Sequence, residues 1–285
     1  MTNLLEIKDL RLSYPGTGFR SKSPEILKGI SLNIAPGETV GLVGESGSGK
    51  STIGRAVLGL AQPTQGSISF DGRDITHLRG RQRRHLSRDI QVVFQDPYTS
   101  LNPSLQISDI LAEPLIAQGV EARSARNQAR QLLDRVGLPA NAAERYPREF
   151  SGGQRQRIAI ARALALKPRL IVCDEPVSAL DLTTQALVLD LFIEIQRATK
   201  TAYLFITHDL AVVRHISHRV AVMYRGEIVE TGATSVVTEQ PEHPYTKRLL
   251  LAAPTADPDL QAKRRDAWKA FSKQRSAPEP TARVG

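Results

Sequence analysis

Short apolar runs alternate along the chain with longer segments of helical periodicity, a pattern typical of an α/β protein. Most of the short runs are rich in Val, Ile and Leu, as buried strands are. We predict β-strands over residues 4–10, 30–34, 39–43, 67–71, 90–94, 170–173, 202–207 and 220–224, and a hairpin that returns over 227–230. Helices are predicted over residues 52–60, 121–136 and 154–166.

The stretch between residues 96 and 168 is mainly helical in pattern. Its clearest segment, 121–136, collects Leu132, Leu133 and Val136 on one side and arginines elsewhere. We therefore predict a helical subdomain, 96–168, inserted into a nucleotide-binding domain that spans residues 1–235. A short extension is expected over 236–256, and the Pro-, Ala-, Lys- and Arg-rich tail 257–285 is expected to be disordered.

Composition narrows the class of protein. The chain has 285 residues with 41% hydrophobic content, and no run approaches the roughly 20 apolar residues that span a bilayer. Its start lacks a signal-peptide pattern, and Cys173 is its one cysteine, so we expect a soluble cytosolic protein without disulfides. The net charge of +9 comes mainly from arginines over 79–88 and from the tail. Because no aromatic residues are interleaved, we expect these arginines to form a solvated face and predict no nucleic-acid binding.

The segment 44–51 reads GESGSGKS and forms a complete phosphate-binding loop. It lies between a predicted strand and a predicted helix, so backbone N–H groups and the helix dipole would meet the same anion. Lys50 can reach the β- and γ-phosphates of a nucleotide, and the Ser51 hydroxyl can ligate Mg²⁺. The predicted ATP-binding residues of this segment are Gly44, Glu45, Ser46, Gly47, Ser48, Gly49, Lys50, Ser51 and Thr52.

Two carboxylates follow the apolar run 170–173. Active residues are expected at the carboxyl ends of buried parallel strands, so Asp174 is predicted to hold Mg²⁺ and Glu175 to orient and polarise the attacking water. Two other candidates favour plain structural roles. Cys173 lies within the strand and is expected to be a buried hydrophobe. His215 and His218, three residues apart on the helix expected after His208, could hold one metal, but with no third ligand nearby an ordinary helix surface is favoured.

The segment 150–157, FSGGQRQR, resembles the signature of the ATP-binding-cassette (ABC) ATPases. A serine and two glycines at the start of a helix make a second anion-binding helix end. The resemblance implies a fold with a RecA-like mixed sheet, an antiparallel β subdomain and an inserted α-helical subdomain. It also implies that two cassettes pack head to tail, so that the signature of one meets the γ-phosphate bound by the other. The signature residues predicted to contact ATP in this way are Ser151, Gly152, Gly153 and Gln154.

Other positions match further elements of the same family, in the same order along the chain. Tyr14 resembles the aromatic residue that stacks on adenine, and Gln95 the glutamine that touches Mg²⁺ and senses the membrane partner. Asp181 lies in a segment similar to the loop that crosses the dimer interface, and His208 resembles the switch histidine at the γ-phosphate. The resemblance thus implies an ATPase with ATP and Mg²⁺ as cofactors, Glu175 and His208 as catalytic residues, and Ser51, Gln95 and Asp174 around the metal.

Three segments make the resemblance more specific: residues 94–103, 173–181 and 243–250. They resemble the ATP-binding subunits of oligopeptide, dipeptide and nickel importers, and the second, F-type subunit more closely than the first. Such a subunit works peripherally at the cytoplasmic face of the inner membrane. The implied partners are two membrane permeases, a second cassette subunit (non-identical rather than a second copy) and, indirectly, an extracytoplasmic solute-binding protein. Many relatives carry a cysteine-bearing tail, but residues 257–285 contain no cysteine, so an iron–sulfur cluster is not expected here.

Three alternatives to a peptide importer subunit were weighed. A nickel or glutathione-like cargo is compatible with the same motifs. A soluble ABC ATPase of DNA repair or translation would call for a coiled-coil insertion, a zinc module or two cassettes, none of which the sequence indicates. A nucleotide-binding module without turnover is disfavoured by the intact Glu175 and His208.

Overall fold

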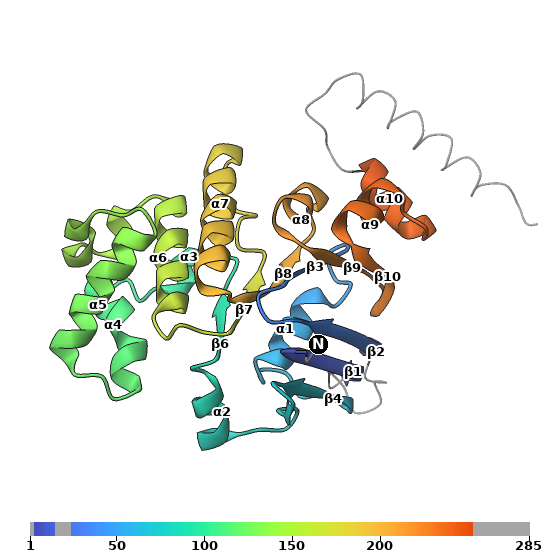
Figure 1. The fold of residues 1–285 in the computed structure, drawn as a ribbon, viewed down its shortest axis with the longest axis horizontal. Coiled ribbons are helices and arrows are strands. Elements are labelled where there is room, and N and C mark those ends of the chain that lie inside the picture. Colours follow the sequence, from blue (N-terminus) through green and yellow to red (C-terminus); the bar gives the residue numbers. More distant parts are fainter. Residues whose placement is uncertain (1–2, 15–23, 253–285) are drawn as a thin grey trace, which may run out of the picture.

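The computed structural model describes residues 3–14 and 24–252, and their strands form two sheets (Figure 1). The antiparallel sheet has the order β2-β1-β4-β5. The larger sheet has the order β10-β9-β3-β8-β7-β6, with parallel neighbours except for the antiparallel pair β9–β10. The strands are β1 (Leu5–Ser13), β2 (Glu25–Ile34), β3 (Thr39–Val43), β4 (Gln65–Phe70), β5 (Arg73–Asp74), β6 (Ile90–Val93), β7 (Leu170–Asp174), β8 (Ala202–Thr207), β9 (Arg219–Tyr224) and β10 (Glu227–Ala233).

Helices connect and flank these strands. Those between β6 and β7 gather on one side of the molecule, where we predicted helical structure (Figure 1). The helices are α1 (Lys50–Val57), α2 (Gly80–Leu86), α3 (Pro97–Ser100), α4 (Ile107–Ala117), α5 (Ala122–Arg135), α6 (Gly152–Leu164), α7 (Leu182–Thr199), α8 (Leu210–Ile216), α9 (Thr234–Glu239) and α10 (Pro244–Ala252). Short 3₁₀ turns cover Ala140–Glu144 and Pro147–Glu149.

Three apolar clusters hold these elements together. One joins the antiparallel sheet, the buried face of α1 and one face of the mixed sheet. The second joins the other face of the mixed sheet to the helices that follow β6. The third, smaller cluster lies between β9, α8 and the two last helices. The predicted architecture of a mixed sheet, an antiparallel sheet and a helical insertion is therefore confirmed.

Within the described residues, no helix combines the length and apolar character needed to cross a membrane. The predicted tail 257–285 and the end of the predicted extension, 253–256, lie outside the described residues.

The expected position of His218 was wrong. His218 does not lie on the helix after His208: α8 ends at Ile216, and the His218 Nδ1 atom accepts a hydrogen bond from the Thr39 amide at 3.0 Å. His215 instead contacts Asp190, with its Nε2 atom 2.8 Å from Oδ1, so the two histidines share no site.

The basic segment 79–88 is only partly a solvated face. Arg83 turns inward and donates hydrogen bonds to the carbonyl groups of Val57 and Leu58, with Nε 2.9 Å from the Leu58 oxygen. These carbonyls end α1, where a cation is favoured by the helix dipole. Arg83 is therefore a cap for α1, while Arg79, Arg81 and Arg84 are exposed as expected.

Candidate active site

The phosphate loop lies where a fully buried strand meets a helix. All five residues of β3 are buried, and α1 begins at Lys50 directly after the loop. Gly44 has φ +155°, and a Cβ atom there would lie 2.1 Å from the Met223 carbonyl oxygen. Gly49 has φ +106°, and its Cβ would meet the Met223 Cε atom at 2.8 Å. The backbone of β9 therefore leaves no room for a side chain at Gly44, and the positive φ favours glycine at both positions.

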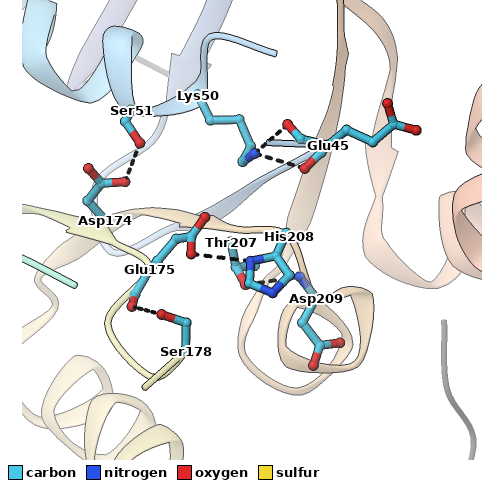
Figure 2. Close-up of polar contacts among 10 residues, drawn as sticks. Glu45, Lys50, Ser51, Asp174, Glu175, Ser178, Thr207, His208 and Asp209 are labelled. Carbon is cyan, nitrogen blue, oxygen red and sulfur yellow. Dashed lines mark hydrogen bonds and ion pairs between the residues drawn. The ribbon is translucent and has the colours of Figure 1, made fainter. Parts of the chain in front are cut away.

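Lys50 is held against the loop by two hydrogen bonds. Its Nζ atom donates to the carbonyl oxygens of Gly44 at 2.8 Å and Glu45 at 2.9 Å (Figure 2). Burial lowers the pKa of the Lys50 ammonium, and the nearby carboxylates of Glu175, Asp174 and Glu45 oppose that shift. A buried cation at a loop of backbone N–H groups is suited to bind an anion.

The Ser48 hydroxyl is also buried and finds no hydrogen-bond partner among the described residues. Buried polar groups are nearly always paired, so this oxygen is available to a ligand with polar atoms. Its place in the loop fits a nucleotide phosphate.

Asp174 and Ser51, the residues predicted to hold Mg²⁺, lie in direct contact. Asp174 ends β7, and its Oδ1 atom accepts a hydrogen bond of 2.7 Å from the Ser51 hydroxyl (Figure 2). Burial raises the pKa of the Asp174 carboxyl, and the hydrogen bond from Ser51 opposes that shift. Within the described ranges, no group of three or more His, Cys, Asp or Glu side chains could hold a metal. One carboxylate and one hydroxyl fit Mg²⁺, which binds few protein oxygens and takes others from phosphates and water.

Glu175 and His208 come together because their strands are neighbours. β7 pairs with β8 in parallel, with Asp174 opposite Ile206, and the Glu175 amide donates to the Ile206 carbonyl at 2.9 Å. Glu175 has φ +48°, an uncommon conformation for a residue with a side chain and one that recurs at functional sites. Its Oε2 atom lies 3.2 Å from the His208 Nδ1 atom (Figure 2). The two predicted catalytic side chains thus form one polar pair at the carboxyl ends of β7 and β8.

A hollow of about 380 Å³ opens over the phosphate loop. Tyr14 lies on its wall with 39% of its surface exposed, so its ring is accessible to a flat ligand. The volume is in the range of small-ligand pockets. The lining residues are Tyr14, Ile26, Ser46, Gly47, Gly49, Lys50, Ser51, Thr52 and Glu175.

The predicted signature lies elsewhere in the molecule. Ser151 caps α6, with its hydroxyl accepting from the Gln154 amide and the Gln154 side chain accepting from the Ser151 amide. Gly153 packs on the first turn of α7, where a Cβ atom would lie 2.1 Å from the Thr184 Cγ2 atom. The signature does not line the hollow over the phosphate loop, and α6 and α1 lie apart in Figure 1.

Asp181 and Gln95 also lie outside that hollow. Asp181 caps α7 by accepting from the Thr184 amide at 2.9 Å, and it is exposed. Gln95 is exposed two residues after β6, the strand beside β7. The next segment forms α3, where the Arg155 guanidinium stacks on the Tyr98 ring at 3.9 Å.

The sequence patterns missed two residues near the loop. The Tyr245 hydroxyl accepts a hydrogen bond of 2.8 Å from the Glu45 amide, and Arg248 lies 3.3 Å from the Glu45 carboxylate. Both come from α10, far along the chain, and no spacing could have indicated the contact. Cys173, in contrast, is fully buried as predicted, and burial raises the pKa of its thiol.

Comparison with known proteins finds relatives of similar sequence and a solved structure of similar fold. A family model described as ABC transporter matches residues 27–178. The oligopeptide transport ATP-binding protein OppF of Lactococcus lactis is 48% identical over 270 residues, which cover 93% of this chain and 85% of that protein. The glutathione import ATP-binding protein GsiA of Pectobacterium atrosepticum is 54% identical over 80% of this chain, which spans 37% of the length of that relative. A solved dimer of the ATP-binding cassette MJ0796, in a post-hydrolysis state with ADP and phosphate, superposes with a TM-score of 0.72, at 30% identity, over 81% of this chain and 98% of that one.

Proposed function

The chain belongs to the ABC transporter family, and from this premise we propose that it is the ATP-hydrolysing subunit of a membrane importer for peptides or related small solutes. The observation that carries the hydrolytic part is the Glu175–His208 pair, 3.2 Å apart, beside a phosphate loop whose buried lysine faces inward. The 48% identity to an oligopeptide transport ATP-binding protein supports the transport part.

The chain's own residues divide the work of hydrolysis. The loop amides, Lys50 and the positive end of α1 bind the phosphates, and the Tyr14 ring stacks on adenine. Ser51 and Asp174 would hold Mg²⁺, which supplies charge stabilisation at the phosphoryl oxygens. Glu175 orients and polarises the attacking water, while His208 holds the Glu175 carboxylate and contacts the γ-phosphate. Gln95, which follows the strand beside β7, would complete the metal surroundings.

A complete site requires a second cassette. The exposed residues Ser151 and Gln154, with Gly152 beside them, form a helix end that lies outside the hollow over the phosphate loop. In a head-to-tail dimer this end would meet the γ-phosphate bound by the partner, with Asp181 at the interface. The dimeric state of the solved cassette relative supports this arrangement. We propose a non-identical second cassette, with a homodimer as the alternative.

The membrane partners are proposed to dock near Gln95. Tyr98 on α3 is 60% exposed, and an apolar hollow of about 320 Å³ lies nearby along β6, with Leu60 and Phe94 exposed on it. An amphipathic cytoplasmic helix of a permease would cover such a surface. The subunit would then sit peripherally at the cytoplasmic face of the inner membrane, and a solute-binding protein would deliver cargo from the other side.

We propose that the transported solute is a peptide. Glutathione is the second candidate, because the chain is 54% identical to a glutathione import protein over the 230 residues they share. Both cargoes contain amide bonds and carboxylates, and the subunits that select between them are the permeases and the binding protein.

Co-expression with two candidate permeases and a second, non-identical cassette subunit tests the proposal. We expect one assembly in detergent that contains two permeases, this chain and the second cassette, and whose ATPase activity depends on both cassettes. Two copies of this chain with full transport would favour the homodimer. ATP turnover by a complex that contains no membrane protein would overturn the transport role.

A further inference from the structure

Helix α10 reaches back to the phosphate loop from 200 residues further along the chain. The Glu45 amide donates a 2.8 Å hydrogen bond to the Tyr245 hydroxyl. One turn later on α10, the Arg248 guanidinium lies 3.3 Å from the Glu45 carboxylate. The amide and the carboxylate of the second loop residue are therefore engaged by α10, while its carbonyl accepts from Lys50.

The Tyr245 hydroxyl is fixed in place by its surroundings. Only 4% of the residue is exposed, and it packs in the apolar cluster that includes Val43 and Val222. Its ring lies against the ring of Tyr224, with centroids 4.2 Å apart and planes inclined by 31°. The Arg248 guanidinium covers both rings, 5.1 Å from the Tyr245 centroid. An acceptor held this rigidly determines where the Glu45 amide can lie.

The other end of the loop is held by the hairpin turn between β9 and β10. The Gly226 amide donates to the Ser48 carbonyl at 3.1 Å, and the Ser48 amide in turn donates to the Glu45 carbonyl at 3.2 Å. The loop is thus anchored at Glu45 by α10 and at Ser48 by the turn. The middle residues Ser46 and Gly47 remain free to line the hollows on either side of the loop.

We propose that α10 is a positioning element for the phosphate loop, with Tyr245 as its main contact and Glu45 as the anchor rather than a ligand of ATP. Preorganised donors bind an anion more tightly because the loop loses less conformational freedom on binding. Without the Tyr245 hydroxyl, the Glu45 amide loses its partner, and the loop must be ordered by the nucleotide itself. The inference rests on the proposed role of this loop in binding ATP.

Tyr245→Phe is the direct test because it removes one oxygen and keeps the ring stack. We expect the Kd for ATP of the full chain to rise about 3- to 10-fold, the usual effect of one lost hydrogen bond. In the assembled transporter KM should rise by a similar factor while kcat changes less than twofold, since Glu175 and His208 are untouched. Arg248→Gln should raise Kd less, about 2-fold, because the ion pair is partly exposed.

Tyr203→Phe is the matched control. That tyrosine is also buried, and its hydroxyl donates to the Phe192 carbonyl at 3.2 Å, in the core on the helical side of the sheet. It should lower the melting temperature without changing Kd. Lys50→Ala tests the proposed nucleotide site independently of α10. If this substitution fails to weaken ATP binding, the proposed nucleotide site is wrong. If it weakens binding but Tyr245→Phe leaves Kd and KM unchanged, only the positioning role of α10 is overturned.

Discussion

Replacing Glu175 by glutamine should stop ATP hydrolysis and leave ATP binding intact. Glutamine has the same shape, so it can keep the left-handed backbone at this position and the 3.2 Å contact with His208. What it loses is the negative charge and the capacity to take a proton from water. ATP binding depends on the loop and on Lys50, which the substitution does not touch.

The size of the effect follows from the role assigned to the carboxylate. Loss of a general base or water-positioning group lowers the rate by about 10²- to 10⁴-fold. That corresponds to roughly 3–5 kcal/mol of transition-state stabilisation at about 1.4 kcal/mol per tenfold change. The affinity for ATP should stay the same or rise. Glu175 is an anion close enough to Lys50 to influence the pKa of the Lys50 ammonium, so it is also close to the phosphates that Lys50 binds.

Single-turnover phosphate release and equilibrium binding of ATP measure the two quantities separately. Glu194→Gln, a change of the same kind on the exposed side of α7, is the control and should behave as the wild type. The Glu175→Gln protein should also accumulate as an ATP-bound dimer, which native mass spectrometry would detect. Hydrolysis within about threefold of wild type would refute the role given to Glu175.

Three further outcomes are expected. Lys50→Ala should weaken ATP binding by about 10- to 100-fold, as loss of a charge-assisted hydrogen bond does, and unchanged affinity in a calorimetric titration would refute its role. Tyr98→Ala should lower transport per ATP hydrolysed in the reconstituted complex while basal ATP hydrolysis by that complex persists; loss of ATP binding by the isolated chain would instead assign α3 to the nucleotide site. Asp174→Asn should raise the melting temperature of the nucleotide-free chain at pH 7.5. Burial raises the folded-state pKa of this carboxyl above its unfolded value near 3.8. The ionised carboxylate therefore lowers the stability of the folded chain at pH values above 3.8. The gain should shrink as the pH falls toward that value, and a gain independent of pH would contradict the assignment.

Local features of the site were predictable because their causes are local. The strand expected at 39–43 is β3, Thr39–Val43, and the loop and α1 follow in the order that the glycines and Lys50 require. The acidic end of β7 and the position of His208 just after β8 were likewise predicted from apolar runs that end in polar residues.

Features that depend on distant pairing were not predictable in the same way. The contact between Glu175 and His208 arises from the parallel register of β7 and β8, which no local pattern specifies. Arg83 belongs to a run that reads as solvated, and its inward turn depends on carbonyl groups 25 and 26 residues earlier. The hydrogen bond between Tyr245 and the Glu45 amide joins residues 200 positions apart. In each case the tertiary fold, rather than propensity, decides the partner.

Uptake of a labelled peptide into proteoliposomes tests the central claim most directly. The vesicles would contain this chain, the two permeases and the second cassette, with ATP on the side of the cassettes and the solute-binding protein on the other. The account predicts peptide accumulation that requires ATP and is lost with Glu175→Gln in this chain, although the complex still binds ATP. Peptide uptake that continues at the wild-type rate with Glu175→Gln, or that proceeds without this chain, would contradict it.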